Sequence, residues 1–134
     1  MKIVVDTNVL ISALGWKKSE HQLLKRIFMG EIKLFMSPQI LEEFIAVANR
    51  KKFRFSKDEI EEFVTSLIEV CDMVIPQEKV ELIKEDPTDN MFLECAMEAK
   101  VDHIISGDKH LIKLKNFRGI SIMNASALLN CADL

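Results

Sequence analysis

Short apolar runs alternate with stretches of helical periodicity along this chain, and this alternation limits the folds that it can adopt. The first run, from Lys2 to Asp6, is almost continuously apolar and ends in a charge, as expected for a strand covered on both faces. Strands are predicted at 2–6, 32–36, 73–75, 103–106 and 120–123, and helices at 19–30, 38–49, 57–70, 86–99 and 125–131. Helices between short strands predict an α/β fold, with helices on both faces of a mostly parallel sheet of roughly five strands.

N-capping residues mark the starts of several predicted helices. Ser19–Gln22 and Ser56–Glu59 have the form of capping boxes, in which the first and fourth side chains each bind a backbone N–H at the helix start. Ser37 is a good N-cap, and Pro38 suits the first helical position because its fixed φ matches a helix. We therefore expect helices to begin at these three places.

Length and composition indicate one globular domain that spans residues 1–134. The chain is 49% hydrophobic and 29% charged, which is ordinary for a globular protein. No apolar run approaches the roughly 20 residues that span a bilayer, and Asp6 interrupts the apolar N-terminal stretch, so we expect a cytoplasmic protein. Cys71, Cys95 and Cys131 lack the paired spacing of a zinc site, and Cys95 falls on an apolar helical stripe. Neither a disulfide nor zinc is expected.

The net charge bears on nucleic-acid binding. A net charge of −3 argues against a protein that binds nucleic acid over its whole surface, because such proteins are normally basic. Any contact with nucleic acid should therefore be local.

Four carboxylates lie where the chain should leave a strand or enter a helix. They are Asp6, Glu43, Asp89 and Asp108. In open α/β sheets ligands bind at the carboxyl ends of the strands, and Asp6 and Asp108 follow two predicted strands. Two unit charges about 4 Å apart repel by roughly 4 kcal/mol at an effective dielectric near 20. If the fold gathers these acids, they need protons or a bound cation, and Mg²⁺ or Mn²⁺ suits oxygen ligands.

Each of these acids also has a purely structural interpretation. Asp86 before Pro87 is a natural helix N-cap, and Asp108 can cap a short helix that begins near Lys109. Asp89 falls at the rim of an apolar stripe in the first turn of its helix, where a carboxylate also complements the helix dipole. Asp6 is the hardest to explain structurally, because an acid directly after a buried strand is partly desolvated.

Helical periodicity does not choose between Glu42 and Glu43. The predicted buried face of their helix consists of Ile40, Leu41, Phe44, Ile45 and Ala48. Glu42 and Glu43 flank that face on opposite sides, so both remain candidates on periodicity alone.

Four short motifs together resemble the PIN-domain ribonucleases. They are Asp6-Thr7-Asn8 after the first strand, Glu43-Phe44, Asp86-Pro87-Thr88-Asp89-Asn90 and Ser106-Gly107-Asp108. Each motif is weak by itself, but their order and spacing resemble the family over essentially the whole chain, from Ile3 to Leu129. The resemblance implies a three-layer α/β/α PIN-like fold.

The resemblance also implies an activity and a site. PIN domains gather acids around one or two Mg²⁺ or Mn²⁺ ions and cleave RNA with metal-activated water, so the residues implied as catalytic and metal-binding are Asp6, Glu43, Asp89 and Asp108. Glu43 is preferred over Glu42 because the glutamate of the family usually precedes an apolar residue. The residues implied to support these acids are Thr7, Asn8, Asp86 and Ser106. Two ions roughly 3.5–4 Å apart can activate water and stabilise the leaving oxygen, so no protein nucleophile is required.

Possible RNA contacts are less distinct in the sequence. The candidates are Trp16, Arg50, Lys51, Lys52, Arg54 and His110. Basic residues interleaved with phenylalanine at 50–55 could follow an RNA backbone and stack on bases, but a solvated loop with its phenylalanines in the core is favoured. Trp16 could instead pack between subunits or against a partner.

Several functions stay open at this stage. The resemblance includes small VapC-like toxins of type II toxin–antitoxin systems, which implies an antitoxin partner and a homodimer. We interpret the chain as a metal-dependent endoribonuclease and a toxin component. The alternatives are a PIN module that binds RNA or protein without cutting, and a phosphotransfer or receiver-type domain, for which this chain has no clear lysine after its last strand.

Overall fold

The structure, a computed structural model, describes residues 1–131. The last three residues of the predicted 1–134 domain lie outside this range. Within residues 1–131 the strands are β1 (Lys2–Val5), β2 (Lys33–Met36), β3 (Asp72–Met73), β4 (His103–Ile105), β5 (Asn116–Phe117) and β6 (Ile120–Met123). The helices are α1 (Thr7–Leu14), α2 (Lys18–Phe28), α3 (Pro38–Ala48), α4 (Lys57–Val70), α5 (Asn90–Ala99), α6 (Lys109–Ile112) and α7 (Ala125–Leu129), with short 3₁₀ turns η1 (Lys51–Phe53) and η2 (Pro87–Asp89).

The strands form one mixed sheet in the order β3-β2-β1-β4-β6-β5. Every neighbouring pair is parallel except β5 and β6, which pair antiparallel. From β1 the chain adds β2 and β3 on one side, whereas β4 and β6 lie on the other. The strand order therefore reverses between β1 and β4, and a crevice at their carboxyl ends is the usual ligand site of such a sheet.

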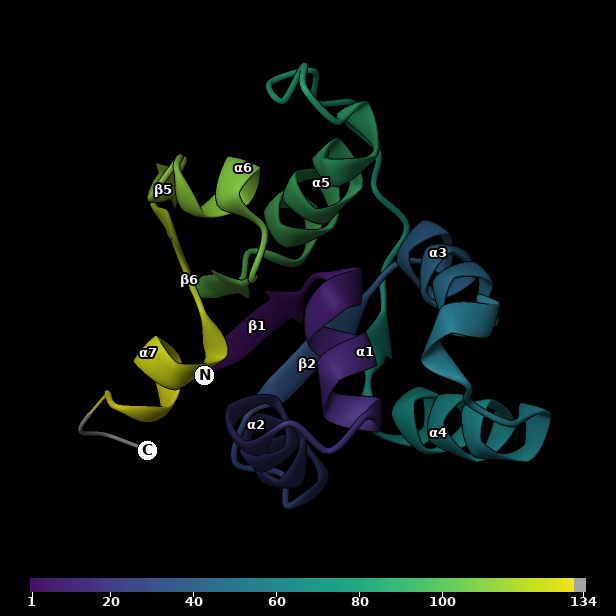
Figure 1. The fold of residues 1–134 in the computed structure, drawn as a ribbon. Helices are drawn as coiled ribbons and strands as arrows, with labels where there is room; N and C mark the ends of the chain where they lie inside the picture. Colours follow the sequence, from purple (N-terminus) through teal and green to yellow (C-terminus); the bar gives the residue numbers. More distant parts are fainter. Residues whose placement is uncertain (132–134) are drawn as a thin grey trace.

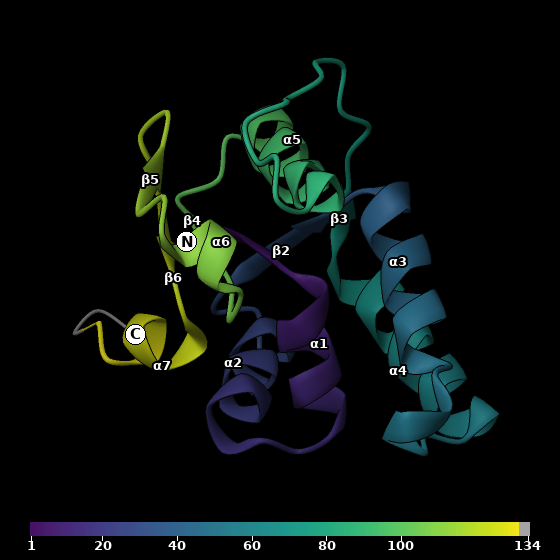
Figure 2. The ribbon, with the colours of Figure 1, turned by 45° about the horizontal axis from the view of Figure 1, so that its top comes forward.

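Helices cover both faces of the sheet, as Figures 1 and 2 show. Helix α5 packs on β1, β2 and β4 from one side, and α1 and α2 lie together on the other. Helix α3 contacts both α1 and α5, so it stands beside the carboxyl end of β1. The predicted three-layer α/β/α architecture is therefore confirmed.

The five predicted strands are all present, with ends that differ by a residue or two, and β5 is an additional strand. It forms a hairpin with β6 through Arg118 and Gly119, whose φ angles of 50° and 85° are those of a type I′ turn. The prediction missed β5 because Arg-Gly is a less familiar turn sequence than Asn-Gly.

The prediction of helices failed in two places. Helix α1 was not predicted, because Val9, Leu10, Ile11 and Ala13 are all buried and its polar side is limited to Asn8 and Ser12. Ser19 does not cap α2, which begins at Lys18 with no side-chain cap. The other two predicted starts are confirmed: Ser37 accepts a hydrogen bond from the Ile40 N–H, and Ser56 and Glu59 form a capping box.

The core between the sheet and its helices is apolar, and Cys95 is buried in it as predicted. On α3 the fully buried residues are Ile40, Phe44, Val47 and Ala48. Ile45, predicted to be buried, is instead 36% exposed. The buried face of α3 therefore includes Val47, and this rotation determines which glutamate of α3 lies near the sheet.

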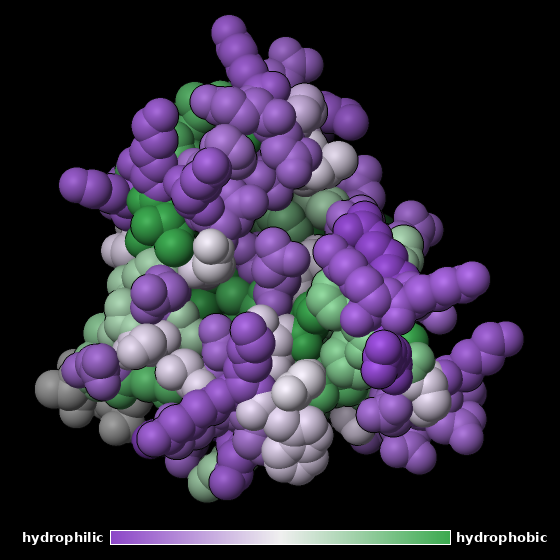
Figure 3. Space-filling view, viewed as in Figure 1, coloured by the Kyte–Doolittle hydropathy of each residue, from purple (hydrophilic) through white to green (hydrophobic). Residues whose placement is uncertain are grey.

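The surface seen from the side of Figure 1 is mainly hydrophilic, with hydrophobic side chains showing between the hydrophilic ones (Figure 3). Within residues 1–131, none of the helices has the length and apolar character needed to cross a membrane.

Candidate active site

An acidic pocket of about 200 Å³ lies at the carboxyl ends of β1 and β4. All four carboxylates singled out in the sequence line it: Asp6, Glu43, Asp89 and Asp108. The other lining residues are Thr7, Asn8, Val47, Arg50, Asp86, Thr88, Met91 and Phe92. Residues from four separate parts of the chain therefore meet where the strand order reverses.

Ser106 connects the two acids that follow β1 and β4. The Ser106 hydroxyl donates a hydrogen bond to Asp6 Oδ2 and accepts one from the Asp108 backbone N–H at 2.9 Å. The other oxygen of Asp6 accepts from the Val9 N–H at 2.9 Å, so Asp6 also caps α1. Asp108 in turn caps α6, with its Oδ1 2.7 Å from the His110 backbone nitrogen. Both acids are therefore held in place by helix capping as well as by the serine.

The turn between residues 86 and 89 supplies two more acids. Asp86 caps η2 by accepting hydrogen bonds from the Thr88 N–H and the Thr88 hydroxyl, at 3.3 Å and 2.6 Å. Asp89 is only 7% exposed, yet its Oδ2 has no hydrogen-bond partner. The Thr7 hydroxyl in the same pocket is also buried without a partner. Such groups are costly unless something pairs with them, so the pocket contains polar atoms with free binding capacity.

The structure separates the two glutamates of α3. Glu43 lies one helical turn before the buried Val47, and both residues line the acidic pocket. Glu42 is exposed and does not line that pocket. Periodicity left the two equivalent because the predicted buried face was centred too close to Ile45.

Burial and neighbouring negative charges raise the pKa of two carboxylates in the pocket, Asp89 and Asp6. The pKa of Asp89 is raised from 3.8 to about 7, mainly because burial disfavours its charged form. Negative charges nearby add to this effect, in decreasing order those of Asp108, Asp86, Asp6 and Glu43. Burial likewise raises the pKa of Asp6, against the opposing hydrogen bond from Ser106. A divalent cation would relieve this repulsion.

The donor set fits a hard divalent ion that keeps part of its water. The acidic groups offer only oxygen atoms, and Asp89 Oδ2 is buried without a partner. In the part of the chain that the structure describes, no group of three or more His, Cys, Asp or Glu side chains is arranged to hold an ion directly. Mg²⁺ commonly binds through one or two carboxylates and retained waters, so these residues fit such an ion.

Only one of the six predicted RNA contacts lies at this site. Arg50, three residues beyond Val47 and just past the end of α3, lines the acidic pocket. Trp16 is 76% exposed and stacks on His21 with ring centroids 4.2 Å apart, beside a different cavity between α1, α2 and α4. The remaining candidates, Lys51, Lys52, Arg54 and His110, do not line the acidic pocket.

The phenylalanines of the basic segment pack as the structural interpretation predicted. Phe53 and Phe55 are partly buried against the core and stack on each other, with ring centroids 5.9 Å apart. Both rings therefore pack within the protein in this conformation.

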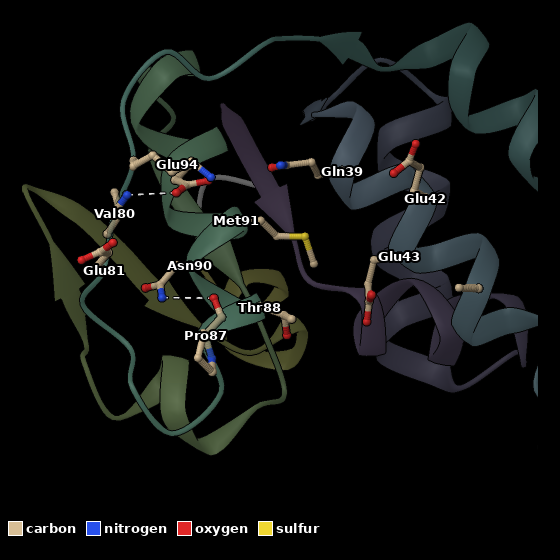
Figure 4. Close-up of a pocket in the computed structure, with 12 residues that line it drawn as sticks. Gln39, Glu42, Glu43, Val80, Glu81, Pro87, Thr88, Asn90, Met91 and Glu94 are labelled. Atoms are coloured by element: carbon tan, nitrogen blue, oxygen red, sulfur yellow. Dashed lines mark hydrogen bonds between the residues drawn. The ribbon is translucent and has the colours of Figure 1, made fainter.

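A larger groove of about 550 Å³ adjoins the acidic pocket (Figure 4). Glu43, Thr88 and Met91 line both cavities. In the close-up, Gln39 and Glu42 project from α3 on one side of the groove, and Asn90 and Glu94 belong to the opposite wall. Neither Asn90 nor Glu94 was among the residues that the sequence indicated as functional. The available signal was their spacing of four residues, which places both polar side chains on one face of a helix whose other residues, apart from Glu98, are apolar.

The fold and the acidic pocket at its strand reversal define an α/β domain of the PIN type, and the chain belongs to the PIN domain family. The pattern of that family matches residues 2–110. The chain is 33% identical to the uncharacterized protein MJ1680 of Methanocaldococcus jannaschii over 120 residues, which cover 87% of this chain and 76% of that protein. Its fold is similar to that in the crystal structure of VapBC2 from Rickettsia felis bound to a DNA fragment from their promoter. That match has a TM-score of 0.65 and 16% identity, and it covers 92% of this chain and 98% of the other.

Proposed function

We propose that this chain is an Mg²⁺- or Mn²⁺-dependent endoribonuclease that cleaves RNA phosphodiester bonds. One observation carries the proposal: Asp6, Glu43, Asp89 and Asp108 line a single pocket at the sheet's ligand position. Membership of the PIN domain family supports the same activity. We further propose that the whole chain is one PIN unit, because β6, beyond the matched residues, pairs with β4 at the centre of the sheet.

The four acids would hold one or two ions, with Ser106 and Thr7 as supporting residues. A bound divalent ion supplies a low-pKa water and offsets negative charge on the phosphate. Ser106 keeps Asp6 and Asp108 at a fixed separation through its two hydrogen bonds. Thr7 offers a buried hydroxyl that is free to bind water or a phosphate oxygen.

We propose Arg50 as the principal protein contact for an RNA phosphate near the acids. It shares a face of α3 with Glu43 and Val47 and extends that face beyond the helix end. Among the described residues, no carboxylate lies within salt-bridge distance of its guanidinium. A guanidinium in this position can form paired hydrogen bonds to a phosphate. Asn8, exposed at the pocket, is a second candidate contact.

We also propose that the protein is the toxin of a toxin–antitoxin pair. The support is its similarity in fold to the crystal structure of VapBC2 bound to a DNA fragment from their promoter. We propose an antitoxin partner on the same support, and a homodimer because the resemblance to small VapC-like toxins implies one. If the protein is a toxin, its expression should arrest growth, and expression of Asp6→Asn should not. Light scattering of the purified chain tests whether it is a dimer.

Cleavage of an RNA pool with Mn²⁺ tests the nuclease activity. The pool contains structured and unstructured RNAs, with single-stranded DNA of the same sequences for comparison. Wild type should cut RNA, and Asp6→Asn should reduce the rate by at least about a hundredfold, because a pocket acid is lost. The matched control is Asp58→Asn, which changes an exposed acid on α4 far from the pocket.

Three results would contradict the proposal. They are equal cleavage by wild type and Asp6→Asn, cleavage that persists in EDTA, and tight RNA binding by the wild type without any cleavage. The last would favour the alternative of a PIN module that binds without cutting.

A further inference from the structure

Three polar side chains on one face of α5 hold an extended segment that leads into the acidic pocket. Asn90, Glu94 and Glu98 are spaced four residues apart, so they lie along the same face of the helix. The segment they hold, residues 77–83, is called the strap below. Each of the three side chains accepts one hydrogen bond from a backbone N–H of the strap. Asn90 Oδ1 accepts from Ile83 at 2.9 Å, Glu94 Oε2 from Val80 at 2.9 Å, and Glu98 Oε1 from Gln77 at 3.0 Å.

The strap depends on these side chains because it belongs to no strand or helix. Between β3 and η2 the described chain has no regular secondary structure. Val80 and Ile83 are nevertheless buried, and a buried backbone N–H is costly unless it is paired. The side chains of α5 therefore take the place of a neighbouring strand, and the strap runs antiparallel to the helix.

Asn90 differs from the other two because it also donates hydrogen bonds. Its Nδ2 is 2.9 Å from the Ile83 carbonyl oxygen and 3.1 Å from the Pro87 carbonyl oxygen. A single buried amide thus binds both ends of the segment from Ile83 to Pro87, which contains Asp86. In Figure 4 the bond from Asn90 to Pro87 lies in the groove wall next to Thr88.

The turn held by Asn90 carries two acids that repel each other. Asp86 is one of the charges that raise the pKa of Asp89, and Asp89 directly precedes Asn90. Asn90 itself does not line the acidic pocket. The amide therefore closes the base of a turn next to which two carboxylates, Asp86 and Asp89, both line the acidic pocket.

We propose that Asn90 is a positioning residue of the acidic pocket. It sets the conformation of the Ile83–Pro87 turn, and through that turn and the supporting Asp86 it controls how well Asp89 binds a divalent ion, without touching ion or RNA. The link between Asn90 and RNA cleavage rests on the proposed nuclease function. Residues that orient metal ligands commonly change metal affinity or activity about 10–100-fold when they are altered.

Two variants of Asn90 and one control test this role in the full chain. Asn90→Ala removes all three hydrogen bonds, and Asn90→Asp keeps the shape and the acceptor for the Ile83 N–H but loses both donors. The control Glu98→Ala removes the contact to Gln77, at the end of the strap away from the turn. The probe is Mn²⁺ alone, and its half-saturating concentration is read from the thermal shift of each protein. RNA cleavage gives kcat and KM separately.

We expect both Asn90 variants to raise the half-saturating Mn²⁺ concentration at least about tenfold. At fixed Mn²⁺ their kcat should fall by a similar factor, with KM for RNA within about twofold, and added Mn²⁺ should restore kcat because the defect lies in ion binding. Glu98→Ala should leave every value within about twofold. A role in stability alone would lower the melting temperature without changing the Mn²⁺ concentration at half-saturation.

The proposal is overturned if a folded Asn90→Ala or Asn90→Asp protein keeps the wild-type Mn²⁺ dependence, or if Glu98→Ala shows the same loss. Should Asn90→Ala not fold, the isosteric Asn90→Asp decides. If wild type binds Mn²⁺ but cuts no RNA, the proposed nuclease function fails while the Mn²⁺ titration still tests Asn90.

Discussion

Replacement of Asp89 by Asn should stabilise the protein when no divalent ion is present. The pKa of Asp89 is raised from 3.8 to about 7 in the folded protein. Each pKa unit corresponds to 1.36 kcal/mol, so a difference of about 3 units means that the ionised side chain destabilises the folded protein by about 4 kcal/mol. Because one side of the pocket is open to solvent, we expect about half of this, or about 2 kcal/mol, from the neutral amide.

The pH dependence gives this prediction a definite sign. Below about pH 4 the carboxyl is protonated in both folded and unfolded chains, so Asp89→Asn should have no advantage. Between pH 4 and 7 only the unfolded chain loses the proton, and wild-type stability falls relative to the variant as pH rises. Above about pH 7 the difference should be constant.

Urea unfolding in EDTA at pH 5, 6, 7 and 8 measures the free energy of unfolding, and thermal melts in the same buffers measure the melting temperature. At pH 8 the variant should melt about 8 °C above the wild type, on a scale of about 4 °C per kcal/mol for a domain of this size. Asp58→Asn, at an exposed position, should change the free energy of unfolding by less than about 0.5 kcal/mol. A variant that is less stable than wild type at pH 8, or a gain that is the same at pH 5 and pH 8, would refute the reasoning.

Three further predictions concern the ion, the RNA and the core. Mn²⁺ at a hundred times its Kd should stabilise wild type by about 2.7 kcal/mol in a thermal melt, and a flat response would count against an ion site. Arg50→Ala should lower the slope of log K against log salt for single-stranded RNA by about 0.7, whereas Arg54→Ala, outside the pocket, should leave it unchanged; equal effects would argue against a specific role for Arg50. Phe44→Ala should cost about 3–5 kcal/mol in urea unfolding, because Phe44 is fully buried against Phe63, and a loss below about 1 kcal/mol would show that the core is packed differently.

Errors in the sequence predictions have identifiable physical causes. Helix α1 is buried nearly all round, so it lacks the alternation of polar and apolar faces on which periodicity depends. Asp6 is a good N-cap residue before Leu10, Ile11 and Ala13, and this could have indicated the start of α1. Asp6 was interpreted only as a candidate ligand. Ser19 shows the opposite error, in which a local capping pattern predicted a helix start and the structure has Ser19 inside α2 instead.

Periodicity also could not separate Glu42 from Glu43. A helix face is a continuous stripe, and its exact centre depends on what packs against it. Contacts of α3 with α1 and α5 bury Val47 and expose Ile45, which turns Glu43 towards the pocket. Trp16 and Arg50 were equally plausible RNA contacts in sequence, yet only Arg50 lies at the acids.

The sequence by itself determined the order of most strands and helices, apart from α1 and β5, because apolar runs and capping residues act over a few neighbouring positions. It also predicted which acids follow strands, since Asp6 stands directly after one apolar run and Asp108 follows another after Ser106 and Gly107. Only the tertiary structure decided that these acids share a pocket with Glu43 and Asp89, and that Asn90 ties the turn beside them. Those outcomes depend on strand order and helix rotation, which are set by packing between residues far apart in the chain.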